Sequence, residues 1–274
     1  MGMRVRRIAI LIDGAFFLKR LPKLVEPRFC DTPAATADSA RHLCKRHVQR
    51  LTNLEGGSAD GVWLDHVYRL FYYDARPFQG VSHHPVLNYR VEFAKSEVAA
   101  FRSELFAELR RKRKFALRLG HTHKEGEWQI AANLTKRLLK TRNWLDRMEQ
   151  VFLHGQAPPN LTAKEEQELV KLISAWRELR HGDVRLGLRQ KGVDMRIGLD
   201  IASITLKEQA DTIVLVTGDS DFVPAAKLAR REGIELLLDP LRQEVSDDLH
   251  EHVDGIVGVF PDPSTYSNPN APET

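Results

Sequence analysis

The stretch Asp211–Asp239 constrains the fold most strongly, because two short apolar runs flank a helical pattern within it. Ile213–Val216 and Ile234–Leu238 are unbroken, which is typical of strands buried on both faces of a parallel sheet. Between them, Phe222–Arg231 has apolar residues at helical spacing, and Gly233 follows where a helix commonly ends. A strand, a helix and a strand in so few residues predict a right-handed βαβ unit.

Two acids follow the first of these strands: Asp219 comes directly after Gly218, and Asp221 comes two residues later. Ligand sites in parallel sheets form outside the carboxyl ends of the strands. Two carboxylates so close together repel each other unless a cation or a proton separates them, and Mg²⁺ and Mn²⁺ prefer oxygen ligands. A helix N-cap would explain one of these acids equally well, so capping and metal binding are both open.

The N-terminal region repeats this arrangement, because the apolar run Ile8–Ile12 ends in Asp13 and Gly14. A glycine beside the acid lets the backbone turn or approach a ligand closely. We expect a helix from residue 15 that carries Lys19. Capping is again the alternative role for Asp13, but two buried strands that both end in acids favour a shared site.

A third acidic segment is Gln190–Leu206, which predicts a largely buried helix. Asp194 lies in its first turn and is expected to face the carboxyl edge of the sheet. Asp200 is six residues further on, about 120° around an ideal helix, and Arg196 is its expected partner. The apolar face is formed by Val193, Ile197, Ile201 and Ile204, with Met195, Leu199 and Leu206 widening it.

The remaining sequence is predicted to form one domain over residues 1–260, with core segments near 5–25, 62–74 and 188–260 and a disordered tail at 261–274. Residues 31–185 are expected to hold a mostly helical, basic insertion with one or two strands. Its predicted strands lie in Val62–Tyr73 and from Phe115, and His121–His123 is read as a loop. Its predicted helices are Thr36–Leu54, Ser96–Arg113, Trp128–Met148 and Leu161–Arg180, the last with a capping box at Thr162 and Glu165.

Two basic groups in the insertion have two readings each. Arg111, Lys112 and Arg113 either bind phosphate or form a solvated helix end. Lys136, Arg137, Lys140, Arg142 and Arg147 are interleaved with Trp144, and cations with an aromatic residue suit single-stranded nucleic acid. An amphipathic helix that packs its Trp into the core would look the same.

The composition sets wider limits. The formal net charge of +4 and the pI near 9.1 permit a nucleic-acid partner without requiring one. The two cysteines lack metal-site spacing and are too few for a disulfide framework, so a cytoplasmic location is expected. No apolar run reaches the ~20 residues that a membrane span requires.

Together, Asp13, Asp194, Asp219 and Asp221 are expected at one edge of the sheet, where a divalent metal would offset their repulsion. Such a site suits phosphodiester hydrolysis, because a metal lowers the pKa of a bound water and offsets phosphate charge. The expected substrate-binding residues are Lys191, Arg196, Lys19, Ser220, Arg111, Lys112 and Arg113.

Three segments resemble the motifs of the NYN domain family in the PIN-like nuclease superfamily: ILIDGAFF, KGVDMRIGLDI and VLVTGDSDFVPAAKLARREGIELLLD. The resemblance implies a three-layer α/β/α sandwich with a mostly parallel central sheet, carrying a large helical insertion. It also implies a ribonuclease that uses Mg²⁺ or Mn²⁺ and cuts single-stranded or structured small RNA. Its acids would be Asp13, Asp194, Asp219 and Asp221, with Asp200 a weaker metal ligand.

Two departures from the family pattern keep alternatives open. Many relatives have Asn three residues after the first acid, where this chain has Phe16, and about 170 residues separate the first two motifs. The insertion would shape substrate choice, form a homo-oligomer or protein-partner surface, or cover the site. The alternative functions are a PIN-like module that binds RNA or protein without cutting, and a phosphoesterase for small molecules.

Overall fold

The computed structural model describes residues 6–54, 61–152, 154 and 160–260, so the predicted tail at 261–274 lies outside the described residues. The chain forms two compact units. The first comprises Met1–Phe78, Ala94–Thr122 and Gln190–Thr274, and the second comprises Gln79–Phe93 and His123–Arg189. Residues 31–185, which were expected to form an insertion, are divided between the two units.

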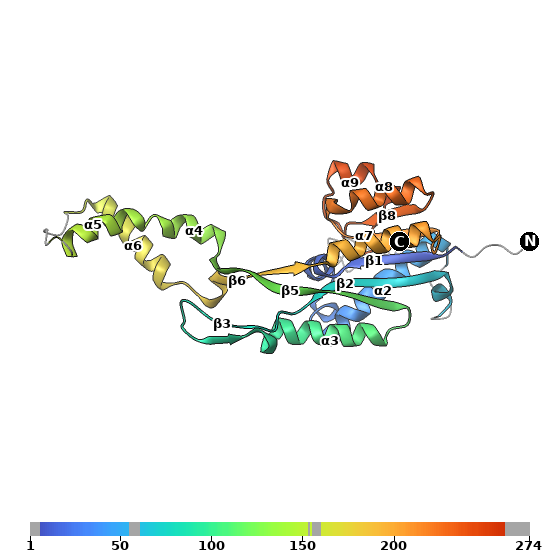
Figure 1. Ribbon diagram of the computed structural model, residues 1–274, viewed down its shortest axis with the longest axis horizontal. Coiled ribbons are helices and arrows are strands. Elements are labelled where there is room, and N and C mark those ends of the chain that lie inside the picture. The colour runs from blue at the N-terminus through green and yellow to red at the C-terminus, as the bar shows by residue number, and fades with distance from the viewer. Residues whose placement is uncertain (1–5, 55–60, 153, 155–159, 261–274) are drawn as a thin grey trace, which may run out of the picture. The chain divides into compact units, whose positions relative to one another are not determined.

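A mostly parallel sheet is the centre of the first unit (Figure 1). In the described part of the chain its strand order is β6-β5-β2-β1-β7-β8-β9. Parallel pairs join β1 to β2 and to β7, β2 to β5, β7 to β8, and β8 to β9. The strands are β1 Ile8–Asp13, β2 Val67–Arg76, β5 Phe115–Ile130, β6 Val184–Lys191, β7 Thr212–Val216, β8 Glu235–Asp239 and β9 Gly255–Ile256.

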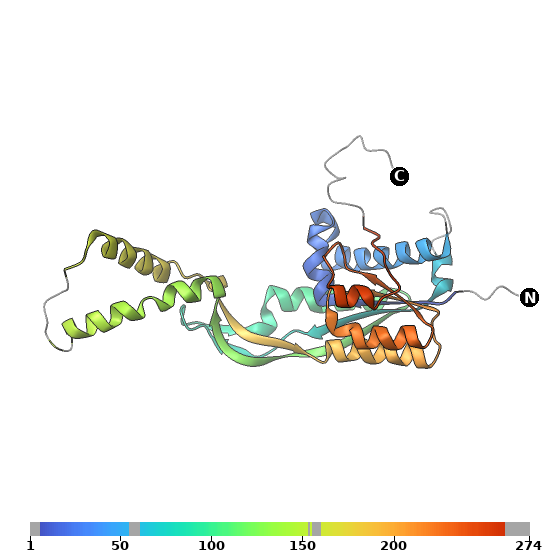
Figure 2. The same cartoon turned by 90° about the horizontal axis from the view of Figure 1, so that it is seen from above.

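Helices cover both faces of this sheet, which confirms the expected α/β/α sandwich (Figures 1 and 2). Successive residues of a strand point to opposite faces, so β1 sends Ile8, Ile10 and Ile12 into one core and Ala9 and Leu11 into the other. The first core lies under α1 Gly14–Arg20, α2 Pro33–Thr52 and α3 Glu97–Arg111, and the second under α7 Val193–Leu206, α8 Val223–Arg231 and α9 Asp247–Glu251.

Helix α7 is only half-buried, which corrects the prediction of a largely buried helix. Ile197 and Ile201 are buried in the core as expected. The widening residues Met195, Leu199 and Leu206 instead point outward, with exposed fractions of 70%, 62% and 65%. A helix that packs on one side of a sheet buries a stripe only, so residues beside that stripe reach solvent.

The second unit contains the hairpin of β3 Val81–His83 and β4 Arg90–Glu92 and the helices α4 Ala132–Leu139, α5 Arg142–Phe152 and α6 Ala163–Arg177. The capping box of α6 is confirmed, since Thr162 and Glu165 exchange both bonds. Two predictions were wrong here. His121–His123 is part of β5, and Trp128 is in the same strand rather than in a helix. Its ring centroid lies 4.9 Å from that of the buried His84, with the two rings tilted by 55°.

Among the described residues, none of the helices is both long and apolar enough to cross a membrane.

Candidate active site

The strand order changes direction at β1, because β2 and β5 follow on one side of it and β7, β8 and β9 on the other. In an open parallel sheet, such a switch point leaves a crevice at the carboxyl ends of the two strands beside it. Asp13 is the last residue of β1, and Asp219 and Asp221 follow β7. Three predicted acids thus come from the two strands that flank the switch point.

Asp13 caps a helix and faces the other acids at the same time. Asp13 is the N-cap of α1, because its carboxylate accepts a hydrogen bond from the Phe16 amide at 3.1 Å. The carboxylate accepts a second hydrogen bond from the Thr217 hydroxyl at 3.4 Å. Burial raises the pKa of the Asp13 carboxyl, and the charge of Asp194 raises it further against these hydrogen bonds. The first turn of α7 lies over the same face of the sheet, because Val193 packs in one core with Leu11 of β1.

Asp219 and Asp221 lie close to Asp194. Asp194 and Asp221 both line one hollow of about 420 Å³ over α7 and the start of α8. Asp219 accepts a hydrogen bond from the Asp221 amide at 3.0 Å and thereby caps a short 3₁₀ turn, Ser220–Phe222. The predicted acids are therefore linked pairwise across three elements, and Ser220 is exposed between the last two.

No ion pair neutralises Asp13, Asp219 or Asp221 within the described ranges 6–54, 61–152 and 160–260. The donor set consists of carboxylate oxygens, which hard divalent cations prefer. Within the same ranges, no group of three or more acidic, His or Cys side chains is close enough to form a complete metal cage. Because Mg²⁺ keeps several waters and takes one or two carboxylates, Asp13 and Asp194 fit what it needs.

Asp200 belongs to a different cluster, which corrects the partner expected for it. The Tyr73 hydroxyl donates to Asp200 Oδ2 at 2.8 Å, and Arg118 Nε donates to the same oxygen at 3.0 Å. Arg196, the expected partner, donates instead to the carbonyl of Gly192. The sequence spacing suggested an intrahelical pair, but two neighbouring strands supply closer partners.

The predicted phosphate-binding cations divide between the two edges of the sheet. Lys19 is exposed on α1, which starts at the acid edge, and Lys191 is exposed at the end of β6. The run from Arg111 to Arg113 lies at the opposite edge, because α3 ends just before β5 begins and Phe115 pairs with Leu70 near the start of β2.

This run is also engaged locally. Arg111 forms an ion pair with Glu108 at 2.7 Å, and Lys112 forms one with Asp38. The structure therefore does not bring Arg111, Lys112 or Arg113 to the acids.

Sequence reasoning missed two further acids at the carboxyl edge. Asp74 directly follows Tyr73, the residue of β2 that pairs with Asp13. It is fully buried and forms an ion pair with Arg102. Asp239 ends β8 and is buried against His47, with 2.8 Å between Nε2 and Oδ2. Each directly follows an apolar strand run, which was the signal available in the sequence.

Phe16 occupies the place where many relatives carry Asn. A Cβ atom on Gly218 would lie 2.8 Å from Cε2 of Phe16, so the ring lies against the backbone that leaves β7. A larger residue at position 218 would therefore need the side chains of Phe16 and Gln243 to move. An aromatic ring at this position offers no hydrogen bond to a substrate or a metal-bound water.

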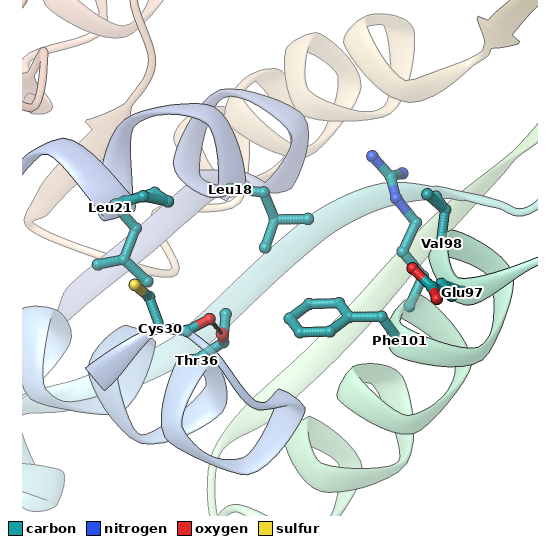
Figure 3. Close-up of a pocket in the computed structure, with 9 residues that line it drawn as sticks. Leu18, Leu21, Cys30, Thr36, Glu97, Val98 and Phe101 are labelled. Atoms are coloured by element: carbon teal, nitrogen blue, oxygen red, sulfur yellow. Dashed lines mark hydrogen bonds between the residues drawn. The ribbon is translucent and has the colours of Figure 1, made fainter. Parts of the chain in front are cut away.

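An apolar cavity of about 390 Å³ lies on the opposite face of the sheet (Figure 3). Phe101 points into it from α3, with Leu18 and Leu21 on the other side. Arg102, which binds Asp74, also lines it. Its walls come from the helices over the first core, so it is separate from the acid-lined hollow.

Comparison with known proteins supports the motif reading. A family model described as the NYN domain matches residues 161–257, which include Asp194, Asp219 and Asp221. A crystal structure of a protein of unknown function from Vibrio parahaemolyticus is similar at 14% identity and a TM-score of 0.41, over 94% of this chain and 95% of that chain. None of the curated proteins matches the sequence significantly.

Proposed function

Since residues 161–257 match the NYN domain, a family of PIN-like nucleases, we propose that this chain is a metal-dependent endoribonuclease. The observation that carries the proposal is the convergence of Asp13, Asp194, Asp219 and Asp221 at the switch point of the sheet, three of them without a basic partner among the described residues. Mg²⁺ or Mn²⁺ held there would supply an activated water and offset charge on the phosphate.

The chain's own groups prepare this site. The Phe16 amide and the Thr217 hydroxyl fix the rotamer of Asp13, which leaves it oriented beside Asp194. Asp13 and Asp194 would hold the metal. Asp219 and Asp221 would accept hydrogen bonds from the attacking water or from other waters bound to the metal. A preorganised carboxylate loses little rotational freedom on binding, so the buried hydrogen bonds of Asp13 favour its role as the central ligand.

Hydrolysis at this site would break the bond between phosphorus and the 3′ oxygen. The water oxygen would form the new bond to phosphorus while one carboxylate accepts the water proton. The departing 3′ oxygen would take up a proton from solvent, so the products carry a 5′-phosphate and a 3′-hydroxyl. Lys191 and Lys19 are the exposed cations we assign to the flanking phosphates. Arg196 is held by the Gly192 carbonyl and is assigned to shaping the start of α7.

A non-cleaving RNA- or protein-binding module is the second candidate. It is favoured by Phe16, whose ring takes the place of a polar family residue. The two candidates differ in one respect that can be measured, because only the nuclease requires the acids for bond breakage.

The test is cleavage of a labelled single-stranded RNA and a hairpin RNA with Mg²⁺, with Mn²⁺ and with EDTA. Asp194→Asn and Asp219→Asn should lose at least about a hundredfold in rate, since each removes charge from the metal site. Asp200→Asn is the matched control on the same helix as Asp194, and it should retain activity because Tyr73 and Arg118 hold that carboxylate. Cutting that persists in EDTA or in both acid variants would contradict the nuclease. RNA binding without any cutting would select the binding module.

A further inference from the structure

The end of α4 and the turn into α5 carry an unusual group of cations. Lys136, Arg137 and Lys140 are all exposed, and Arg142 follows at the start of α5. No acid lies among residues 132–142. We call Lys136, Arg137, Lys140, Arg142 and the neighbouring Trp176 the α4–α5 patch.

Several cations elsewhere in the second unit are paired with acids. Arg189 binds Glu125, Lys124 binds Glu127, and Arg147 binds Glu165. In contrast, Lys136, Arg137 and Lys140 have no acidic partner within the described residues, and Arg142 has only a 3.5 Å pair with the exposed Asp146. The α4–α5 patch is therefore a local excess of positive charge, because residues 132–142 contain four cations and no acid.

The α4 dipole accounts for part of this excess, because cations are favourable in the last turn of a helix. It explains Lys136 and Arg137. It does not explain Lys140 and Arg142, which lie beyond the helix end, nor the aromatic residue beside them.

Trp176 supplies that aromatic residue. It lies on α6 with 44% of its surface exposed, and its indole Nε1 donates to the Thr141 hydroxyl at 2.9 Å. Thr141 lies between Lys140 and Arg142 in the sequence, so the indole is held directly beside the cations. The hydrogen bond holds the indole ring in one orientation, and much of the ring remains exposed to solvent. Helices α4 and α6 also pack on each other through Leu138 and Ala175 (Figures 1 and 2).

A fixed, exposed indole among unpaired cations combines the two interactions that single-stranded nucleic acids make with proteins. Bases stack on aromatic rings, and cations follow the phosphates. We propose that the α4–α5 patch is a binding surface for single-stranded RNA, separate from the acid site. That the strand is RNA rests on the proposed function, whereas stacking and phosphate contact would serve any single strand.

The test measures binding of a fluorescein-labelled single-stranded RNA to the full-length chain in EDTA, by anisotropy, across a series of KCl concentrations. The triple variant Lys136→Ala, Arg137→Ala, Lys140→Ala should bind at least about tenfold more weakly, and the slope of log K against log salt should fall by about 2 for three lost contacts. Trp176→Ala should weaken binding by at least about fivefold, and Trp176→Phe should recover part of that loss because it still stacks.

The matched control removes the same positive charge from paired cations in the same unit: Arg90→Ala, Lys124→Ala, Arg189→Ala. These residues are bound to Glu92, Glu127 and Glu125. An equal loss of RNA affinity in this control would overturn the proposal, because it would show that affinity depends on the net charge of the protein and not on the α4–α5 patch. The single exposed change Lys140→Glu serves as a second variant, and circular dichroism verifies that each protein is folded.

A competing outcome is self-association, because Leu145, Val170 and Ile173 are also exposed on α5 and α6. Unchanged RNA affinity in the triple variant, with a dimer that dissociates in Trp176→Ala, would overturn RNA binding in favour of a protein contact. Binding is measured without cleavage, so failure of the nuclease remains distinguishable.

Discussion

Asp74 illustrates what burial does to a carboxyl group at the acid edge. It is fully buried, and its Oδ2 has no hydrogen-bond partner in the described residues. Burial raises the pKa of Asp74 from 3.8 to about 6, although the Arg102 charge and the Ala75 amide oppose this. The negative charge of Asp13 contributes to the rise, which shows that the two acids are electrostatic neighbours.

This raised pKa predicts a pH dependence of stability. Between 3.8 and about 6 the native state binds a proton at Asp74 that the unfolded state has lost, so the group makes the free energy of unfolding fall as pH rises through this range. The rise in pKa corresponds to about 3 kcal/mol. Urea unfolding of wild type and Asp74→Asn across this range should therefore diverge. Parallel profiles would show that Asp74 titrates normally.

Gly14 is the second residue whose role is clear from packing. A Cβ atom there would lie 2.6 Å from the carbonyl oxygen of Tyr73 and 2.6 Å from Cε1 of Tyr72. The glycine beside Asp13 thus allows a close approach to β2 rather than to a ligand.

Gly14→Ala should consequently lower the free energy of unfolding by about 1–3 kcal/mol, because a backbone carbonyl cannot move aside cheaply. The control is Gly198→Ala, where a Cβ meets nothing within 4 Å in the middle of α7. That change should be neutral or stabilising by up to about 1 kcal/mol. Chemical denaturation compares the two, and equal effects would contradict the packing account.

At the scale of elements, the apolar runs and helical spacing predicted β1, β2, β7, β8, α2, α3, α7 and α8 correctly. The long strand β5 was only partly foreseen. Its outer half contains Lys124, Glu125 and Gly126, residue types that are depleted in strands, and it is paired with β6 in the sheet. Strand pairing between distant segments is not visible in local patterns.

Helix α6 offers a test of local encoding. Thr162 accepts from the Glu165 amide and Glu165 accepts from the Thr162 amide at 2.8 Å. Thr162→Ala removes one of these bonds and should destabilise the helix by about 1 kcal/mol. Hydrogen exchange should then accelerate in the first turn of α6, with α7 unchanged as the internal control. Unchanged exchange at α6 would mean that the cap contributes nothing.

The cap also has a pH dependence. These hydrogen bonds lower the pKa of Glu165 to about 2, with the backbone amide of Thr162 the largest cause. The stability that Glu165 contributes should therefore be complete above its ordinary pKa of 4.5 and be lost progressively as pH falls from there to about 2.

At the scale of the whole molecule, the two units differ in how much apolar surface they bury. The first has two large cores, one on each face of the sheet. The described part of the second has a small cluster at Leu138, Ala175 and Leu179. Regions with few buried apolar contacts open at lower free energy. Amides of α4 and α6 should thus exchange faster than those of β1 and β7, and equal protection would contradict the division.

The candidate site was predicted in part, and the reason lies in topology. Asp13, Asp194, Asp219 and Asp221 could be placed together because parallel strands and the helices beside them share a carboxyl edge. In contrast, the pairing of β5 with β2 decides at which edge of the sheet α3 ends, and so where Arg111–Arg113 lie. Likewise, the partners of Asp200 come from strands far away in the sequence. Such long-range neighbours leave no local signal.

The most direct test of the central claim, that the switch-point acids form one cation site, is titration of free Mn²⁺ by electron paramagnetic resonance. Wild type should remove Mn²⁺ from the free pool, and Asp13→Asn or Asp194→Asn should weaken this binding at least about tenfold, since each lowers the charge of the site. Asp200→Asn should bind as wild type does, because its carboxylate serves Tyr73 and Arg118. Equal binding by all four proteins, or none by the wild type, would contradict the account.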